Sequence, residues 1–166
     1  MRLRSFARIK GFVITEPSID WRHDSGDQSA RLVAQIEGGV AREPLIEWIE
    51  VTIDCREVGV VAEFWRQLLG LALLDDPLPG WRRAASTVPG GPALTFQPVP
   101  EPKVGKTRVH LDLRTEDLPA AAATIRALGG DWTGEVHVYD EGTVAVMADP
   151  EGTEFCLLGP PGSVLA

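Results

Sequence analysis

Two short stretches of the 166-residue chain alternate ionisable with apolar residues, and each could place its ionisable side chains on one face of a β-strand. The second stretch carries His110, Asp112 and Arg114, and the first includes Glu50 and Asp54. A histidine and carboxylates that share a face are side chains able to transfer protons or to bind a metal cation. A carboxylate such as Glu50 needs a partner when it points into a cavity, because burial of an unpaired charge is costly.

The elements that must position these residues occur twice. After each alternating stretch the apolar spacing changes to three and four residues, which predicts a helix. The helix after residue 115 is capped by Asp117 and has a proline in its first turn, and the helix after residue 54 ends at Gly70. Because Glu50 precedes Glu57 by seven residues, as His110 precedes Asp117, the chain reads as a duplicated module.

Three further strand candidates follow each predicted helix. They cover residues 71–74, 81–87 and 93–97 in the first copy, and 132–135 or 136–139, 143–148 and 154–158 in the second. We therefore predict an α+β fold with two βαβββ modules. The predicted division is an N-terminal extension over residues 1–45, a domain over 46–160 with modules 46–99 and 108–160, a proline-rich linker over 98–107, and a tail over 161–166.

The N-terminal extension has no counterpart in the repeat. It contains a candidate strand over residues 7–15 and a candidate helix around residues 30–36. The apolar run Phe12-Val13-Ile14 could cover a sheet edge, so we expect the protein to self-associate as a homodimer.

Composition narrows the class of protein. With 44% hydrophobic and 24% charged residues, the chain is long enough for one soluble domain with a real core. Its net charge of -8 comes from residues 46–166, with nine basic and eighteen acidic residues, which argues against a nucleic-acid partner. Cys55 and Cys156 form no close pair, and no segment reads as a signal peptide or a membrane span. We therefore expect a cytoplasmic protein with neither a disulfide framework nor a membrane partner.

The two modules, the run FWRQLLGL after the first strand and the run ADPEGTEFCLLG near the end resemble the vicinal oxygen chelate superfamily. This superfamily includes glyoxalase I, extradiol dioxygenases, and bleomycin and fosfomycin resistance proteins. The runs FQPVPEPKVGKTRVHLDL and DPEGTEFC look like its glyoxalase-like domains. The resemblance implies that the sheets curve around a shared cup, with the helices outside.

The resemblance also implies where a divalent metal, such as Zn, Ni, Mn or Fe, would bind. The superfamily takes its metal ligands from the first and last strand of each module, and the matching positions here are Glu50, Gln97, His110 and Cys156. Glu154 lies two residues before Cys156 on the same strand face and is a possible substitute, since relatives usually have a glutamate near this point. Cys156 also reads as a small buried apolar residue, and His110 as a hydrogen-bonded histidine without a metal.

Several other residues are candidates for contacts with a ligand in the cup. Asp54 and Asp112 occupy matching places in the two modules, where they could flank a ligand or cap loops. Aromatic or soft apolar side chains that could line the cup, or pack in the core, are Trp48, Trp81, Phe96, Trp132, Tyr139 and Met147. If the cup is dry, Glu50 could act as a base while His110 or a metal polarises a carbonyl oxygen, as glyoxalase-type isomerisation requires. Alternatively, Glu50 only pairs with Arg108 or Arg114.

Three functions stay open at this point. The first is a small-molecule-binding protein of the sequestering or resistance type. The second is a metal-dependent lyase, isomerase or dioxygenase, and the third is an interaction module without small-molecule chemistry. The ligand set discriminates between the first two, because a set of two histidines and two glutamates would favour the enzyme and this chain lacks it.

Overall fold

The computed structural model describes residues 8–9, 12–13, 49–88 and 91–165. Contacts divide the chain into two units, Met1–Leu45 and Ile46–Ala166. In the first unit, β1 (Arg8–Ile9) and β2 (Phe12–Val13) pair with each other as antiparallel strands. The prediction of one continuous strand over residues 7–15 was therefore wrong, because this stretch pairs with itself. The predicted helix around residues 30–36 and the candidate Trp48 lie outside the described residues.

The first module of the second unit has the predicted order of elements. Its elements are β3 (Val51–Cys55), α2 (Val58–Leu69), β4 (Ala72–Leu73), β5 (Arg82–Ala85) and β6 (Ala93–Pro98). The sheet order is β3-β6-β5-β4, and only the β3–β6 pair is parallel. The first strand therefore pairs directly with the last.

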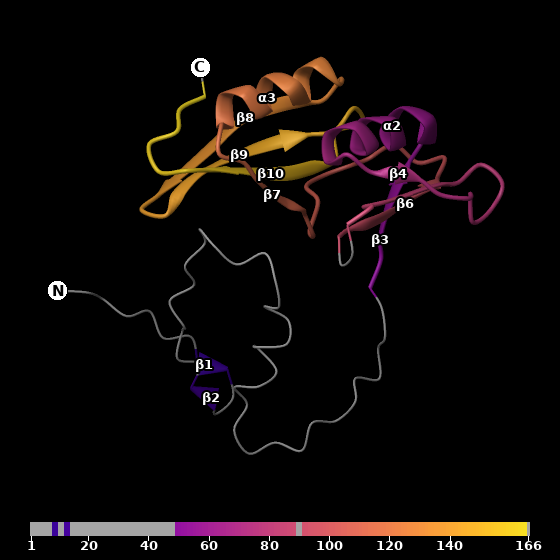
Figure 1. The fold of residues 1–166 in the computed structure, drawn as a ribbon, viewed down its shortest axis with the longest axis horizontal. Coiled ribbons are helices and arrows are strands. Elements are labelled where there is room, and N and C mark those ends of the chain that lie inside the picture. Colours follow the sequence, from indigo (N-terminus) through magenta and orange to yellow (C-terminus); the bar gives the residue numbers. More distant parts are fainter. Residues whose placement is uncertain (1–7, 10–11, 14–48, 89–90, 166) are drawn as a thin grey trace. The chain divides into compact units, whose positions relative to one another are not determined.

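The second module repeats this arrangement. Its elements are β7 (Asp112–Arg114), α3 (Leu118–Ala127), β8 (Asp131–Tyr139), β9 (Gly142–Ala148) and β10 (Glu154–Gly159). The sheet order is β7-β10-β9-β8, with β7 and β10 parallel. Figure 1 shows α2 and α3 on the same side of the two sheets. Both alternatives for the strand after α3 belong to β8, whose register shifts between Trp132 and Val136.

The first strand of each module is shorter than predicted. β7 begins only at Asp112, although the alternation of residue types starts at residue 108. Val109, an apolar residue of this alternation that we expected to pack against the core, lies before the strand and is 81% exposed. Leu111 and Leu113 are partly buried against the core, as expected. Residues 109–111 instead contribute to the pocket described below.

The helices begin and end where the sequence indicated. Asp117 caps α3 by accepting a hydrogen bond from the backbone N–H of Ala120 at 3.0 Å. Gly70 ends α2 in the left-handed conformation with φ 63°, which a glycine adopts without steric cost. Glu57 makes no side-chain cap at the start of α2, so this helix depends on another residue for its cap.

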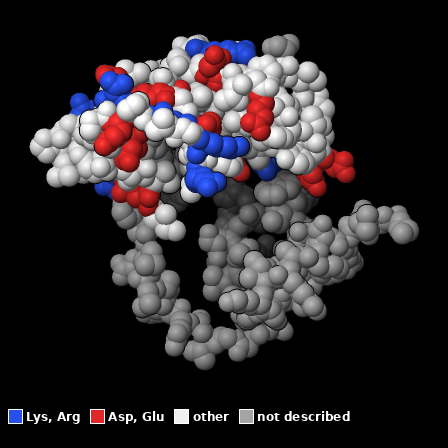
Figure 2. Space-filling model, turned by 180° about the vertical axis from the view of Figure 1, so that it is seen from behind, with Lys and Arg blue, Asp and Glu red and all other residues white. Residues whose placement is uncertain are grey.

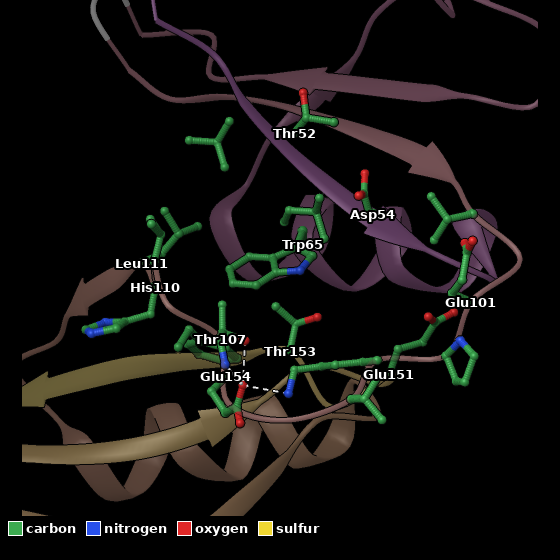
Figure 3. A pocket seen from close by; sticks show the side chains of 18 residues that line it. Thr52, Asp54, Trp65, Glu101, Thr107, His110, Leu111, Glu151, Thr153 and Glu154 are labelled. Carbon is green, nitrogen blue, oxygen red and sulfur yellow. Dashed lines mark hydrogen bonds and ion pairs between the residues drawn. The ribbon is translucent and has the colours of Figure 1, made fainter.

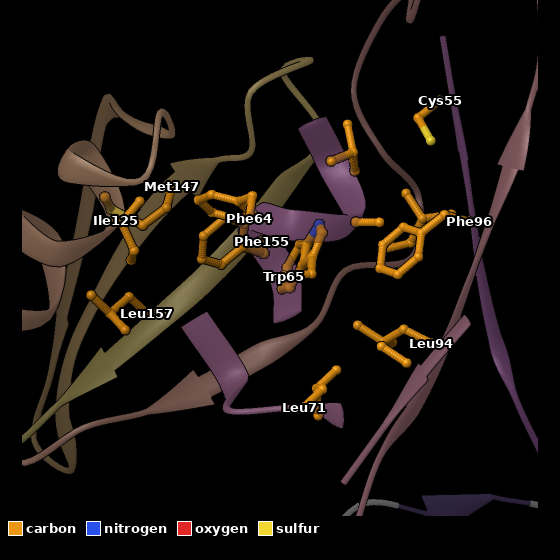
Figure 4. Packing of buried hydrophobic residues seen from close by; sticks show 14 of the residues in the cluster. Cys55, Phe64, Trp65, Leu71, Leu94, Phe96, Ile125, Met147, Phe155 and Leu157 are labelled. Carbon is orange, nitrogen blue, oxygen red and sulfur yellow. The ribbon is translucent and has the colours of Figure 1, made fainter. Parts of the chain in front are cut away.

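The hydrophobic core joins the two modules through three aromatic rings (Figure 4). Trp65 of α2 lies 4.9 Å from Phe155 of β10, measured between ring centroids, and 5.4 Å from Phe64. All three rings are at most 2% exposed. Burial of large aromatic side chains is a dominant source of stability, so the two modules share one core.

On the face shown in Figure 2, acidic and basic side chains are interspersed. In the part of the chain that the structure describes, no helix has the length and apolar character needed to cross a bilayer.

Candidate functional site

A pocket of about 500 Å³ lies where the two modules and the linker meet (Figure 3). The first module contributes residues 51–54 of β3 and Trp65 of α2, and the linker contributes residues 99, 101–104 and 107. The second module contributes residues 109–111, 151 and 153–155. This volume is within the range of small-molecule sites, which are generally concave and mainly apolar.

The tight turn between β9 and β10 fixes one side of the pocket. Asp149, which is 3% exposed, accepts hydrogen bonds from the backbone N–H groups of Glu151 and Thr153 at 3.0 and 2.9 Å. Its other carboxylate oxygen accepts a hydrogen bond from the indole nitrogen of Trp65 at 3.3 Å. Burial raises the pKa of Asp149, and these hydrogen bonds oppose the rise. Asp149 thus connects the turn of one module to a helix of the other.

Glu151 makes a second connection between the modules. Its carboxylate accepts hydrogen bonds from the backbone N–H groups of Arg56, at 2.9 Å, and Glu57, which precede α2. A negative charge at this end of a helix is favourable because the first N–H groups lack partners within the helix. Glu151 therefore supplies to α2 the cap that Glu57 does not, from 94 residues further along the chain.

Glu154 holds the linker against β10. Its carboxylate lies 2.8 Å from the ammonium of Lys103 and accepts hydrogen bonds from the backbone and the hydroxyl of Thr107, at 3.1 and 2.5 Å. The side-chain hydrogen bonds from Lys103 and Thr107 lower the pKa of Glu154 to about 2. Glu154 lines the pocket, as does its partner Lys103.

His110, Asp112 and Cys156 form the group with metal-binding side chains. Asp112 and Cys156 are direct partners in the parallel pairing of β7 and β10, and His110 precedes Asp112 by two residues. The ring nitrogen Nδ1 of His110 lies 3.0 Å from a carboxylate oxygen of Asp112 and 3.4 Å from the sulfur of Cys156. The three donor atoms lie within 4.8 Å of one another. Strand register therefore brings Asp112 and Cys156 together, and the segment just before β7 adds His110.

The thiol of Cys156 is partly buried beside a carboxylate. Burial raises its pKa, and the negative charge of Asp112 raises it further. The protein environment therefore favours the protonated thiol, which is a weak nucleophile.

Glu50 lies outside this group and does not line the pocket. One of its oxygens lies 2.7 Å from Nε of Arg83 and accepts a hydrogen bond from the hydroxyl of Thr95 at 2.5 Å. The expectation that Glu50 has a partner is met by Arg83 on β5, rather than by Arg108 or Arg114. Sequence reasoning missed Arg83 because it reaches Glu50 only through the pairing of non-adjacent strands.

The remaining candidates separate into three groups. Asp54, His110 and Glu154 line the pocket, whereas Gln97 pairs in register with Asp54 but is not among the lining residues. Met147 and Phe96 are completely buried in the core. The candidates Trp81, Trp132 and Tyr139 are neither fully buried nor among the lining residues.

Sequence reasoning did not single out the linker as part of the site. Val99, Glu101, Lys103 and Thr107 all line the pocket. The prolines and the lack of periodicity in this stretch predicted a stiff linker. They did not predict where the linker lies relative to the two modules. Sequence reasoning did not single out Glu151 either.

Comparison with known proteins identifies the same architecture. The model of the family described as "Glyoxalase-like domain" matches residues 50–158. No curated protein matches the sequence. Among solved structures, a glyoxalase/bleomycin resistance protein/dioxygenase family enzyme from Burkholderia phytofirmans is similar, with 18% identity and a TM-score of 0.53, over 67% of this chain and 96% of that one.

Two further structures have more specific descriptions. A variant of the fosfomycin resistance protein FosX from Listeria monocytogenes, solved with Mn(II) and a dihydroxypropylphosphonic acid, has 13% identity and a TM-score of 0.57, over 69% of this chain and 90% of that one. Lactoylglutathione lyase from Agrobacterium tumefaciens has 16% identity and a TM-score of 0.50, over 70% of this chain and 96% of that one. At these identities the likeness establishes the fold alone.

Proposed function

The chain belongs to the glyoxalase-like domain family of the vicinal oxygen chelate superfamily, and from that premise we propose that it binds a small organic molecule in the pocket between its two modules. The observation that supports this function is the pocket itself, about 500 Å³ in volume and lined from both modules and the linker. Sequestration of the ligand, as in a resistance-type protein, requires only such a pocket and no catalytic group.

Two features favour binding over catalysis. Glu50, the candidate base, is neutralised by Arg83 and lies away from the pocket lining. The thiol of Cys156 has a raised pKa, which makes it a poor nucleophile. Neither residue is therefore poised for proton transfer or covalent chemistry on a ligand in this pocket.

A pocket-filling variant tests the binding function. Thr52 is an exposed residue of β3 that lines the pocket, so Thr52→Trp should occupy part of the cavity without disturbing the core. In a ligand-observed NMR screen of a fragment library against the full chain, we expect hits that bind the native protein and lose binding to Thr52→Trp. Thr124→Trp, on the exposed side of α3, is the matched control and should keep those hits. Absence of hits, or hits that survive Thr52→Trp, would overturn the proposal.

A metal-dependent lyase, isomerase or dioxygenase is the second candidate, and the group of His110, Asp112 and Cys156 favours it. Imidazole, carboxylate and thiolate are donors that suit zinc or a similar borderline cation better than a hard cation. Three protein ligands would leave a position open, and a bound cation would supply a Lewis acid for an oxygen atom of the ligand. His110 also lines the pocket, and its ring lies at the edge of the group of lining side chains in Figure 3.

Cobalt substitution tests this second candidate. If the three residues bind the cation, the full chain loaded with Co(II) should absorb in the near ultraviolet through a thiolate-to-cobalt transition. Cys156→Ser should remove that absorption, and His110→Ala should abolish stoichiometric metal content. Cys55→Ala is the control, because Cys55 is buried and desolvation raises its pKa to about 12. Metal retained by His110→Ala would refute the ligand role of that histidine.

A further inference from the structure

More negatively charged than positively charged side chains line the pocket. Four carboxylates line it, those of Asp54, Glu101, Glu151 and Glu154, against the single ammonium of Lys103. In Figure 3, Asp54, Glu101 and Glu151 lie on the right-hand side of the view and His110 lies on the left. The carboxylates come from β3, the linker, the turn between β9 and β10, and β10 itself, so only the folded chain brings them together.

Two of these carboxylates and the lysine already have partners within the protein. Lys103 pairs with Glu154 at 2.8 Å, which leaves the lysine little capacity to neutralise another anion. Glu151 is held by the backbone N–H groups of Arg56 and Glu57. By contrast, the carboxylates of Asp54 and Glu101 have no hydrogen-bond or ion-pair partner among the residues that the structure describes. The pocket thus retains two carboxylates that a ligand could pair with.

The rest of the lining is largely apolar. Val99 and Val104 of the linker line the pocket, as do Val109 and Leu111. Val104 and Val109 are 90% and 81% exposed, so a ligand that covers them removes apolar surface from water. A ligand that fits this site therefore needs an apolar body as well as a group that meets the two carboxylates.

We propose that the pocket selects an organic cation with an apolar body, whose charged group lies between Asp54 and Glu101. This inference names the ligand class for the binding function proposed above and rests on that function. An anionic ligand of the same shape would meet an excess of carboxylates, and a neutral one would gain no charge pairing. Glu50 has no part in this discrimination, since Arg83 neutralises it and it is not among the lining residues.

A matched set of probes tests the inference on the full-length protein. Hexyltrimethylammonium, hexanol and heptanoate share one hexyl chain and differ in the charge of the head group. We expect saturation-transfer NMR titrations to give affinities in the order cation, neutral, anion. Added NaCl should weaken the cation alone, because salt screens pairing with exposed carboxylates.

Two substitutions identify the carboxylates. Asp54→Asn and Glu101→Gln remove charge with little change of shape, and each should weaken hexyltrimethylammonium about two- to fivefold, as exposed charge pairs do. Binding of hexanol should stay the same. Asp140→Asn and Glu141→Gln, in the turn between β8 and β9, are the matched controls, because they remove the same charges outside the pocket lining.

The outcomes separate this inference from the binding function. If Thr52→Trp blocks all three probes but their affinities are equal, the protein binds small molecules and the preference for a cation is wrong. If the control substitutions weaken the cation as much as the pocket substitutions do, only general attraction operates and the inference is also wrong. If none of the three probes binds, the cation inference is overturned, and the fragment screen described above decides the binding function separately.

Discussion

Glu154 is a carboxylate whose ionisation is coupled to folding. Its pKa is about 2 in the folded protein, against an ordinary value of 4.5, because Lys103 and Thr107 hydrogen-bond to its charged form. A depressed folded-state pKa contributes stability that is present above the unfolded pKa and is lost as the pH falls through the folded pKa. This contribution should therefore disappear between about pH 4.5 and pH 2.

Glu154→Gln should remove that part of the acid dependence. We expect the melting temperature of the variant to fall less steeply than that of the native protein over this pH range, and to lie below it at neutral pH. Thermal unfolding followed by circular dichroism at several pH values measures both. Glu141→Gln, in an exposed turn, is the control and should follow the native curve. Parallel curves for the native protein and Glu154→Gln would contradict the assignment.

Met147 was a candidate for ligand contact, yet it is completely buried in the core and is not among the lining residues. Met147→Ala should lower the free energy of unfolding by about 2–5 kcal/mol, the range for truncation of a buried large side chain. Urea denaturation measures this loss. If Met147→Ala remains folded, it should bind pocket ligands as the native protein does. Loss of binding without loss of stability would instead show that Met147 contacts the ligand.

The elements depend on contacts across the modules as well as on local signals. Helix α3 is capped within its own module by Asp117, whereas Glu151 of the second module caps α2 of the first. The same residue lines the pocket. The turn between β9 and β10 therefore has two structural roles, in helix capping and in shaping the site.

Glu151→Ala should destabilise the protein by about 0.5–2 kcal/mol, as loss of a helix cap does. Urea denaturation of the variant beside Glu141→Ala, an exposed carboxylate on another turn, separates loss of the cap from loss of charge. Because Glu151 connects the modules, amide exchange should also accelerate at the start of α2 in the native state. An unchanged exchange rate there would show that Glu151 is dispensable for this helix end.

Each of the two four-stranded sheets has an edge strand on either side. In the two four-stranded sheets the edge strands are β3 and β4 in one and β7 and β8 in the other. On β8, Val138 and Tyr139 are 73% and 56% exposed. Exposed edges and apolar side chains of this kind are commonly covered by another chain.

Self-association therefore stays a prediction for the intact protein. Light scattering coupled to size-exclusion chromatography should give the mass of a dimer at micromolar concentration. Val138→Lys on β8 should shift the mass toward the monomer if this strand forms the contact, whereas Glu116→Lys, between β7 and α3, should not. A monomeric mass for the native protein would contradict the prediction.

The sequence by itself determined the two modules and their helices. The alternation around His110, the spacing of apolar residues after it and the capping by Asp117 are local patterns, and local patterns are readable because the backbone has fixed periods. The family resemblance predicted one site for Glu50, Gln97, His110 and Cys156; His110 and Cys156 lie together, whereas Glu50 pairs with Arg83. Periodicity did not predict that the linker lines the pocket, nor did it decide whether Met147 lines the cup or packs in the core.

Only the tertiary structure decided which polar groups meet. Arg83 reaches Glu50 because β3 and β5 both pair with β6. Asp112 reaches Cys156 through the parallel register of β7 and β10, and Glu151 reaches the start of α2 from the other module. These partners are separated by 33 to 95 residues. A sequence shows which residues can carry a charge. The free energy of ionisation of each carboxylate, however, depends on the distance to its partner and on its exposure to water, and both are set only when the strands and modules assemble.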